Sequence, residues 1–578
     1  VALSGLPTMF ATWWADGAAW EMPRPARELL FLKTGEGLET QPPRARRGLF
    51  GRLDQQWQFD SDLGGETIGG QASGLTLAAS RIDMEALPEA NAAYMEWTVE
   101  VANASRQQQE ARLTLALPEG AVATRATLWV QGKPREASVA TRSEARAAYE
   151  SVVQRRRDPL LVTTDGSGRL LVQAFPIEPG QRMKIRVGVT APMQVAADGE
   201  RSVGLPAIVS RNFAIPDMLR HDVQVEGASG IRDLLLEPQD GPSGPVLAGR
   251  ISDTILLRRT GRLSAPTLDA PVLAAGKLGA LRVRQRIAPA AAGEAAPLML
   301  LVDSSQSNRM AARALAASLD SLAPGFPVGL TIAGSTVQQV PPAPWSAAQK
   351  ARMLELLAAQ RFEGGHDNVP GLIATLNTAG TILWVHGVQP VRFAASTSEL
   401  ETALERARGK LPRLIRFQNV AGPAFGLAGQ RWLDTARDVA PSERQRLGLD
   451  ALLSELSGAE PHWAVLRKPV AGGSPPADVR GGGHIVRLWA AGEAGSSQGE
   501  ARKAAGKQAA KLGLIASDTG AVVLETDAET QSKGLPSAPS NIPAVPEPAT
   551  WMMLISGFYL LGWQMRRRRT LLTGRGPQ

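Results

Sequence analysis

The chain has 578 residues and no cysteine, so disulfide bonds and thiolate chemistry are excluded. Hydrophobic residues make up 44% of the sequence and charged residues 20%, which is the composition of a folded protein of several domains. The net charge is +8, but five basic residues lie in the last thirteen positions, which contain no acid. The rest of the chain is therefore only slightly basic, and we expect no nucleic-acid partner.

Residues 1–90 are interpreted as an N-terminal leader or linker. The first twenty residues, VALSGLPTMFATWWADGAAW, have no basic start, no continuous apolar run and no initial methionine. They do not have the pattern of a signal peptide. Either the start codon is non-standard or upstream sequence is missing, and we favour the second explanation, with transmembrane spans preceding Val1.

Residues 91–195 alternate between apolar and polar positions and are punctuated by turns, which predicts β-strands. One short helix, RSEARAAYESVVQRR, interrupts them. The region resembles the VIT domain, which implies an antiparallel, sandwich-like β fold. The residues that carry this resemblance are Leu117-Pro118-Glu119-Gly120-Ala121, Glu144-Ala145-Arg146-Ala147-Ala148-Tyr149-Glu150 and Phe175-Pro176-Ile177-Glu178-Pro179-Gly180.

Residues 196–292 contain further strand-like runs, among them HDVQVEG, VLAGRI and LRVRQRI. We interpret them as a second β region without chemistry of its own.

Strands and helices alternate from residue 293 to residue 470. The apolar run PLMLLV is followed at once by polar residues, as a buried parallel strand would be, and the helical stretch NRMAARALAASLDSLA comes next. This alternation predicts a doubly wound parallel sheet, in which ligands bind at the carboxyl ends of the strands.

Asp303, Ser305 and Ser307 form a D-x-S-x-S motif at such a strand end. The motif resembles the metal-ion-dependent adhesion site of von Willebrand factor type A domains. Asp and Ser oxygens are suitable ligands for a hard divalent cation such as Mg²⁺.

Two further positions differ from that family's pattern. His366 stands where the family has a threonine, in the loop Phe362-Glu363-Gly364-Gly365-His366-Asp367-Asn368, and His386 replaces an aspartate after the next strand. Three alternatives stay open. The site has lost its metal, or it holds a hard cation weakly through Asp303, Ser305, Ser307 and Asp367, or His366 and His386 join Asp303 to bind Zn²⁺.

Residues 471–500 are rich in Gly, Pro and Ser and are predicted to be a flexible linker. They include Gly495-Ser496-Ser497-Gln498-Gly499, which matches the nucleophile-elbow pattern, but no histidine follows it in the chain. Residues 501–528 are predicted to form a helix and a strand that pack back onto the body.

The C-terminus has the pattern of a membrane anchor. Residues 529–548 read as a Ser/Pro tether, residues 549–565 contain no charge, and residues 566–578 are basic. Seventeen helical residues rise roughly 25 Å, enough to cross a bilayer core, and clustered arginines stay in the cytoplasm. We therefore expect a cell-membrane protein with a single C-terminal span and its bulk outside the cytoplasm.

The order of these parts resembles the PEP-CTERM sorting signal of Gram-negative bacteria. The resemblance implies recognition by a membrane-embedded exosortase-type enzyme and an envelope destination. The residues that carry it are Pro546, Glu547, Pro548, Arg566, Arg567, Arg568 and Arg569.

The predicted fold class is multidomain, with a sandwich-like β domain, a doubly wound α/β domain and one transmembrane helix. The predicted function is non-catalytic binding, adhesion or scaffolding on the extracytoplasmic face, with a protein or surface polysaccharide as ligand. The alternative is a metal-dependent hydrolase that uses His366, His386 and Asp303.

Overall fold

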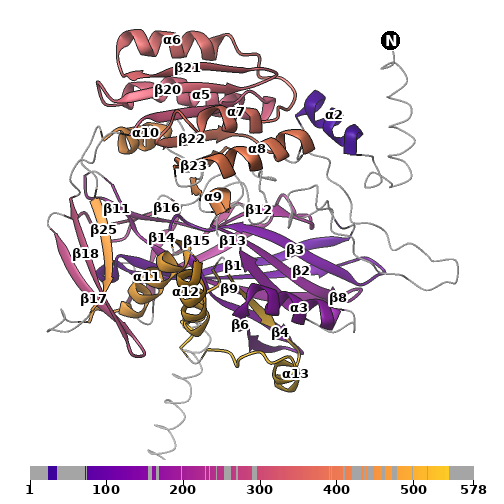
Figure 1. Ribbon diagram of the computed structural model, residues 1–578. Coiled ribbons are helices and arrows are strands. Elements are labelled where there is room, and N and C mark those ends of the chain that lie inside the picture. The colour runs from indigo at the N-terminus through magenta and orange to yellow at the C-terminus, as the bar shows by residue number, and fades with distance from the viewer. Residues whose placement is uncertain are drawn as a thin grey trace, which may run out of the picture.

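A computed structural model describes residues 24–35 and 72–545, apart from short interior segments, of which the longest are 253–261, 420–430, 440–447 and 471–477. Two bodies of different architecture lie one above the other in Figure 1. The lower body is built mainly from β-sheets, and the upper body is a sheet between two layers of helices. The helix α2 (Arg24–Thr34) lies beside the upper body.

The lower body contains two large sheets that share one hydrophobic core. The eight-stranded sheet has, in spatial order, β14 (Glu237–Gly241), β15 (Gly244–Ser252), β13 (Arg220–Glu226), β1 (Leu75–Leu87), β2 (Ala92–Asn103), β9 (Arg182–Pro192), β4 (Val122–Val130) and β5 (Lys133–Glu136). The six-stranded sheet has β12 (Ala207–Arg211), β3 (Gln109–Ala116), β8 (Arg169–Ile177), β7 (Leu160–Thr164), β26 (Thr519–Val523) and β6 (Ser138–Thr141), and the helix α3 (Arg142–Val153) contacts β26, β6 and β7.

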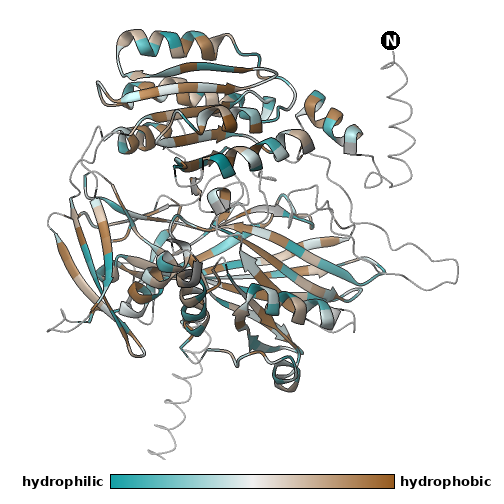
Figure 2. Cartoon of the chain, in the orientation of Figure 1, coloured by the Kyte–Doolittle hydropathy of each residue, from teal (hydrophilic) through white to brown (hydrophobic). Residues whose placement is uncertain are grey.

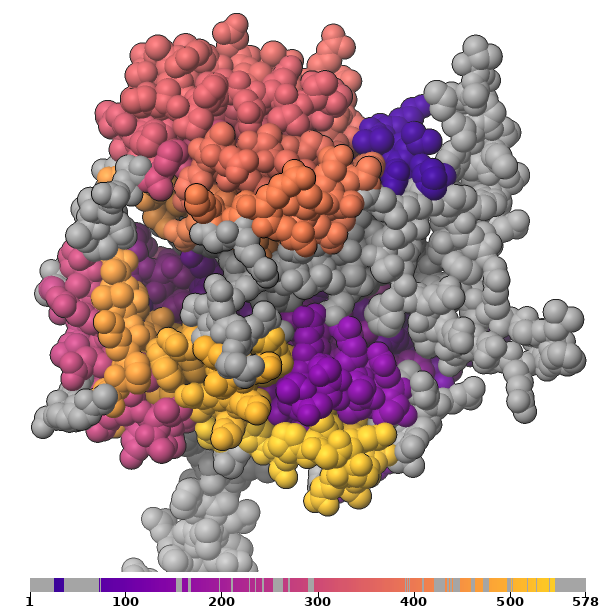
Figure 3. All heavy atoms as spheres, in the orientation of Figure 1, coloured from indigo at the N-terminus to yellow at the C-terminus, as the bar shows by residue number. Residues whose placement is uncertain are grey.

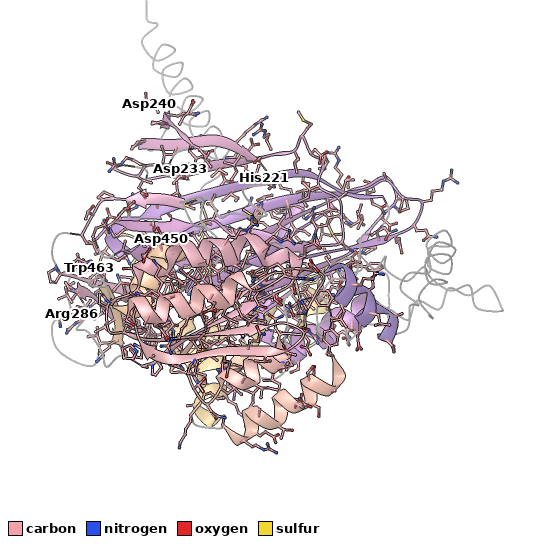
Figure 4. All side chains as sticks on the ribbon, turned by 90° about the horizontal axis from the view of Figure 1, so that it is seen from above. His221, Asp233, Asp240, Arg286, Asp450 and Trp463 are labelled. Atoms are coloured by element: carbon pink, nitrogen blue, oxygen red, sulfur yellow. The ribbon has the colours of Figure 1, made fainter. Side chains whose placement is uncertain are left out.

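The second β region is not a separate unit, which corrects the sequence-based division. Its strands β12 and β13 to β15 belong to the two large sheets, and β1 pairs with β13 in parallel. His221 on β13, labelled in Figure 4, is completely buried, and its Nδ1 lies 2.6 Å from Ser80 Oγ. Trp97 Nε1 donates to the same hydroxyl over 2.8 Å. These contacts join β1, β2 and β13 inside one core.

Two smaller sheets flank the large ones. One contains β10 (Gln194–Val195), β11 (Arg201–Gly204) and β16 (Arg262–Ala265), and the other contains β17 (Val272–Leu278), β18 (Leu281–Pro289) and β25 (Trp463–Pro469). The helix α11 (Gly482–Ser496) packs on β17 and β18 and contacts α12 (Gly499–Lys511). Half of the segment predicted as a flexible linker is therefore a helix, whose Ile485 and Val486 are completely buried.

The described C-terminal part of the expected tether also packs against the sandwich. Helix α13 (Asp527–Ser532) precedes a chain that is buried at Leu535 and again at Val545. The Val545 amide donates to Glu96 Oε1 over 3.2 Å, and Arg487 donates to the Asn541 carbonyl over 2.5 Å. Residues 541–545 are thus held by side chains of the body.

Glu96 anchors this contact because two arginines compensate its buried charge. Arg125 lies 2.6 Å from one carboxylate oxygen, and Arg186 lies 3.1 Å from the other. Removing one partner of a buried ion pair typically costs about 3–5 kcal/mol, since the other charge stays desolvated.

The upper body, residues 298–457, is a six-stranded α/β sheet. Its strand order is β21 (Val337–Pro344), β20 (Pro327–Ala333), β19 (Leu298–Asp303), β22 (Thr381–His386), β23 (Arg413–Gln418) and β24 (Arg437–Val439), with only β21 antiparallel. One face carries α5 (Arg309–Ser318), α6 (Ala347–Ala358) and α10 (Leu449–Ser457), and the other carries α7 (Val369–Thr375), α8 (Ala394–Arg406) and α9 (Arg431–Asp434). Figure 2 colours the strands between these layers largely hydrophobic.

The predicted fold class and the predicted localisation both include a single C-terminal transmembrane helix. Both predictions are wrong in this element. Within residues 24–35 and the described part of 72–545, every helix is too short or too polar to cross a membrane. The apolar stretch 549–565 lies outside the described residues. The predicted fold class also gave the lower body one sandwich-like domain, whereas the described strands form two large and two small sheets.

His484 is a buried titratable group at the start of α11. Its Nδ1 lies 2.9 Å from Thr190 Oγ1, and its ring stacks on Tyr94 with centroids 5.3 Å apart. Burial, reinforced by the charge of Arg487, lowers the pKa of His484 to about 3. The folded protein therefore keeps this imidazole neutral.

Acid should consequently destabilise the fold through His484. Below its ordinary pKa of about 6.5 the unfolded chain binds a proton, whereas the folded chain binds one only near pH 3, so stability falls between these values. Between pH 7 and pH 5 we expect a loss of about 2 kcal/mol in the free energy of unfolding. Urea unfolding of the wild type and of His484→Gln checks this, and an equal pH dependence in both proteins would contradict it.

Candidate functional site

Three loops meet at the carboxyl edge of the upper sheet. β19 is completely buried and ends at Asp303, and its parallel neighbours β20 and β22 end beside it. The loops are residues 304–308 after β19, residues 359–368 before α7, and residues 387–393 after β22. Since parallel strands end at one edge, polar residues distant in sequence converge there.

The Asp303 carboxylate is the centre of this edge and has no exposed surface. Its Oδ1 accepts hydrogen bonds from the Ser305 amide (2.9 Å), the Ser305 hydroxyl (2.5 Å) and Asn368 Nδ2 (3.0 Å). Its Oδ2 accepts from the Gly387 amide (3.3 Å) and Gln389 Nε2 (3.2 Å). Protein donors therefore occupy both oxygens.

Burial raises the pKa of Asp303 above its ordinary value, and the hydrogen bonds from Ser305, Asn368 and Gly387 oppose that shift. The donors stabilise the charged form, as hydrogen bonds to a carboxylate do. They supply the stabilisation that a cation would supply at such a site.

His366 joins the site through its backbone. Its amide donates to Ser305 Oγ over 2.8 Å, and its carbonyl accepts from Asn368 Nδ2 over 2.9 Å. Ser305 Oγ thus donates to Asp303 and accepts from His366, which leaves it poorly placed to ligate a metal.

His386 is completely buried at the end of β22. Its Nδ1 lies 2.7 Å from the Gly387 carbonyl oxygen, to which it donates, and its ring lies 4.2 Å from that of Trp384. Trp384 Nε1 in turn donates to Asn368 Oδ1 over 2.9 Å. The imidazole therefore packs against Trp384, which in turn positions Asn368.

Ser307 packs directly over Gly387. A Cβ atom on Gly387 would lie 1.9 Å from Ser307 Oγ, so only glycine fits under this hydroxyl. The Ser307 hydroxyl is buried without a hydrogen-bond partner, and its carbonyl accepts from Asn419 Nδ2 over 3.1 Å.

The Asp367 carboxylate accepts hydrogen bonds from the two helices α7 and α8. Its Oδ1 accepts from the Val369 amide at the start of α7 over 3.0 Å, and its Oδ2 accepts from the Ser396 hydroxyl on α8. Burial raises the pKa of Asp367, while the Ser396 hydrogen bond lowers it. Asp367 and Asp303 therefore have separate partners.

The hydrogen bonds of these residues favour the alternative in which the site has no metal. In the part of the chain that the structure describes, no group of three His, Asp or Glu side chains could hold a metal ion together. Asp303 and Ser305 already hydrogen bond each other, and His366 contributes its backbone rather than its ring to these bonds. The sorting-signal residues, from Pro546 to Arg569, lie outside the described residues.

Amide side chains form the part of the site that the sequence analysis missed. Besides Asn368 and Gln389, Asn308 joins β19 to β22 by donating to the carbonyls of Asp303 (2.7 Å) and Val385 (2.9 Å). Their only signal in the sequence is their position at strand and helix ends, where Asn and Gln are also common as capping and turn residues.

Comparison with known families confirms the VIT resemblance. Residues 80–189 match the family model of the vault protein inter-alpha-trypsin domain, so this part of the sandwich is a VIT domain. No curated protein matches the chain.

Several solved structures are similar in part. They include a von Willebrand factor type A protein from Catenulispora acidiphila (16% identity, 32% of this chain and 48% of that one, TM-score 0.24). A putative nutrient-binding protein from Legionella pneumophila has 9% identity over 33% and 66% of the two chains, with a TM-score of 0.22. A zinc metallopeptidase from Deinococcus radiodurans has 13% identity over 39% and 50%, with a TM-score of 0.21. The chain thus spans about half to two thirds of the length of these structures.

The substitution Asn368→Asp tests whether amide donors, rather than a cation, stabilise the charged Asp303 carboxylate at this edge. Asn368→Asp removes one donor and places a second carboxylate against Asp303, so we expect about 2–4 kcal/mol of destabilisation in EDTA. Because two facing carboxylates attract hard cations, millimolar Mg²⁺ should recover part of that loss. Chemical unfolding with and without Mg²⁺ measures both effects.

Asn419→Asp is the matched control, since Asn419 lies at the same edge but donates to the Ser307 carbonyl. It should show no recovery with Mg²⁺. If Asn368→Asp unfolds at the wild-type denaturant concentration, the account of this site is wrong.

Proposed function

We propose that this chain is a non-catalytic binding protein that contacts its partner through the carboxyl edge of the upper sheet without a metal. The observation that carries the proposal is the Asp303 carboxylate, both of whose oxygens accept hydrogen bonds from protein donors. An edge ordered in this way can present its loops to a partner in the absence of a cation.

The exposed residues around Asp303 suit a protein contact. Gln306 within the D-x-S-x-S motif and Arg309 just after it are exposed, and Met310 is 67% exposed at the start of α5. Methionine side chains are flexible and polarizable, and they adapt to apolar partner surfaces. Ligands of open α/β sheets bind at the carboxyl edge of the strands. This supports the carboxyl edge, rather than the helix-covered faces, as the partner-binding surface.

The geometry gives no support to the alternative metal-dependent hydrolase. Such an enzyme would use Asp303, His366 and His386 together, but both oxygens of Asp303 already accept hydrogen bonds from protein donors, and His366 joins the site through its backbone amide. A partner of protein or surface polysaccharide class is the better proposal.

The C-terminal motif adds a separate proposal, that an exosortase-type enzyme processes the chain near Pro546-Glu547-Pro548. Its support is the order of the motif in the sequence. The preceding residue, Val545, is buried, and its amide donates a hydrogen bond to Glu96 Oε1.

Site-specific photo-crosslinking tests the binding edge. A photoreactive amino acid at position 306 should give adducts at least fivefold more abundant than the same amino acid at position 355 of α6, because only the first lies at the carboxyl edge. Mass spectrometry of adducts formed in the producing cells distinguishes a protein from a glycan. Addition of EDTA should leave the yield unchanged.

Equal yields at the two positions, or adducts at 306 that disappear with EDTA, would contradict the proposal. Both Gln306 and Glu355 are exposed, so a difference in yield cannot come from burial of the probe.

A further inference from the structure

Helix α2 lies on two of the three loops of the carboxyl edge. The Gly365 amide donates to the Leu32 carbonyl over 3.2 Å, and the rings of Phe31 and Phe393 are 6.5 Å apart. In Figures 1 and 3 the helix sits against the upper body, beside α7 and α8. A segment from the start of the chain therefore covers part of the edge.

Helix α2 packs into a notch at Gly364 and Gly365, two positions without a side chain. A Cβ atom on Gly365 would lie 2.6 Å from both the ring and the carbonyl oxygen of Phe31, and one on Gly364 would lie 2.2 Å from the Leu32 carbonyl oxygen. Any larger residue at either position would collide with the helix. Gly364 also has a positive φ of +59°, which favours glycine independently.

The notch receives the C-terminal turn of the helix. The last carbonyls of a helix lack partners within it, and they must be satisfied from elsewhere. Here Thr34 Oγ1 donates to Leu30, the Gly35 amide donates to Phe31 over 2.7 Å, and the Gly365 amide donates to Leu32. Gly35 itself has a φ of +70°, as helix-ending glycines do.

Phe31 is the most deeply buried of the α2 side chains that the structure describes. Phe31 is 1% exposed, whereas Leu29 and Leu32 are 61% and 41% exposed. A contact made by one deeply buried ring and by backbone hydrogen bonds can also be made by another helix with the same residues.

The notch is connected to the Asp303 donors. The Gly364 carbonyl accepts from the Gln306 amide over 2.8 Å, and His366, two residues further on, donates to Ser305 Oγ. An occupant of the notch therefore rests on the same loop that orders the site.

We propose that this notch is a binding site for the C-terminal turn of a helix that carries phenylalanine four residues before glycine, and that α2 fills it from within the chain. This inference rests on the proposed function, because it names the class of partner for the same edge: a protein helix that competes with α2. The partner binds only when α2 leaves.

A labelled peptide of residues 22–36 tests the notch in the full chain. Wild-type protein should bind it at least tenfold more weakly than Phe31→Ala, in which the internal helix has lost its anchor. The matched control, Leu29→Ala, removes an exposed side chain of the same helix and should behave as the wild type. Fluorescence anisotropy gives the affinities, and circular dichroism checks that each variant is folded.

Adding Gly365→Val to the Phe31→Ala chain fills the notch and should abolish peptide binding. Equal affinity of the peptide for wild type and Phe31→Ala would overturn the inference, as would unchanged binding after Gly365→Val or no binding to any variant. If the peptide binds to no variant but the probe at position 306 still forms crosslinked adducts, the proposed function stands and the inference about the notch is wrong.

Discussion

The buried carboxylate of Asp303 is the constraint on which the upper body depends. A charge without exposed surface must be compensated, and here five hydrogen bonds from backbone, hydroxyl and amide groups do so. Those donors come from three loops that are far apart in sequence. Satisfying one carboxylate therefore fixes the positions of Ser305, Asn368 and Gln389 together, and with them the surface that a partner would meet.

The lower body depends on a similar constraint at Glu96. Arg125 and Arg186 compensate its charge, and the amide of Val545 completes its hydrogen bonds. Strand β26 and residues 541–545 bring the end of the described chain back onto strands near its beginning. The VIT strands consequently share their sheets and core with segments from both later regions.

Local patterns in the sequence identified individual strands, because each strand has its own apolar run or its own alternation of apolar and polar residues. The apolar run 298–302 is the buried strand β19, and the alternating runs near 93–193 form VIT strands, as expected. The placement of β12 and β13 could not be predicted, because pairing partners between 91 and 141 residues away leave no local pattern. The segment interpreted as transmembrane, residues 549–565, lies outside the described residues, and within them no helix is long and apolar enough to cross a membrane.

The sequence located the candidate site but left its chemistry open among three alternatives. The spacing of Asp303, Ser305 and Ser307 correctly pointed to a strand end, and the sequence also placed His366 and His386 near it. Sequence cannot tell whether a nearby histidine offers its ring or its backbone, and here His366 uses its backbone and His386 packs on Trp384. Asn368 and Gln389 were missed because amides at turns have many ordinary roles.

The most direct test of the central claim is calorimetric titration of Mg²⁺, and then Zn²⁺, into full-length protein stripped with EDTA. If protein donors satisfy Asp303, neither ion should bind at this site with a dissociation constant below about 1 mM, which corresponds to roughly 4 kcal/mol of binding free energy. Stoichiometric binding of either ion that disappears in Ser305→Ala would contradict the account.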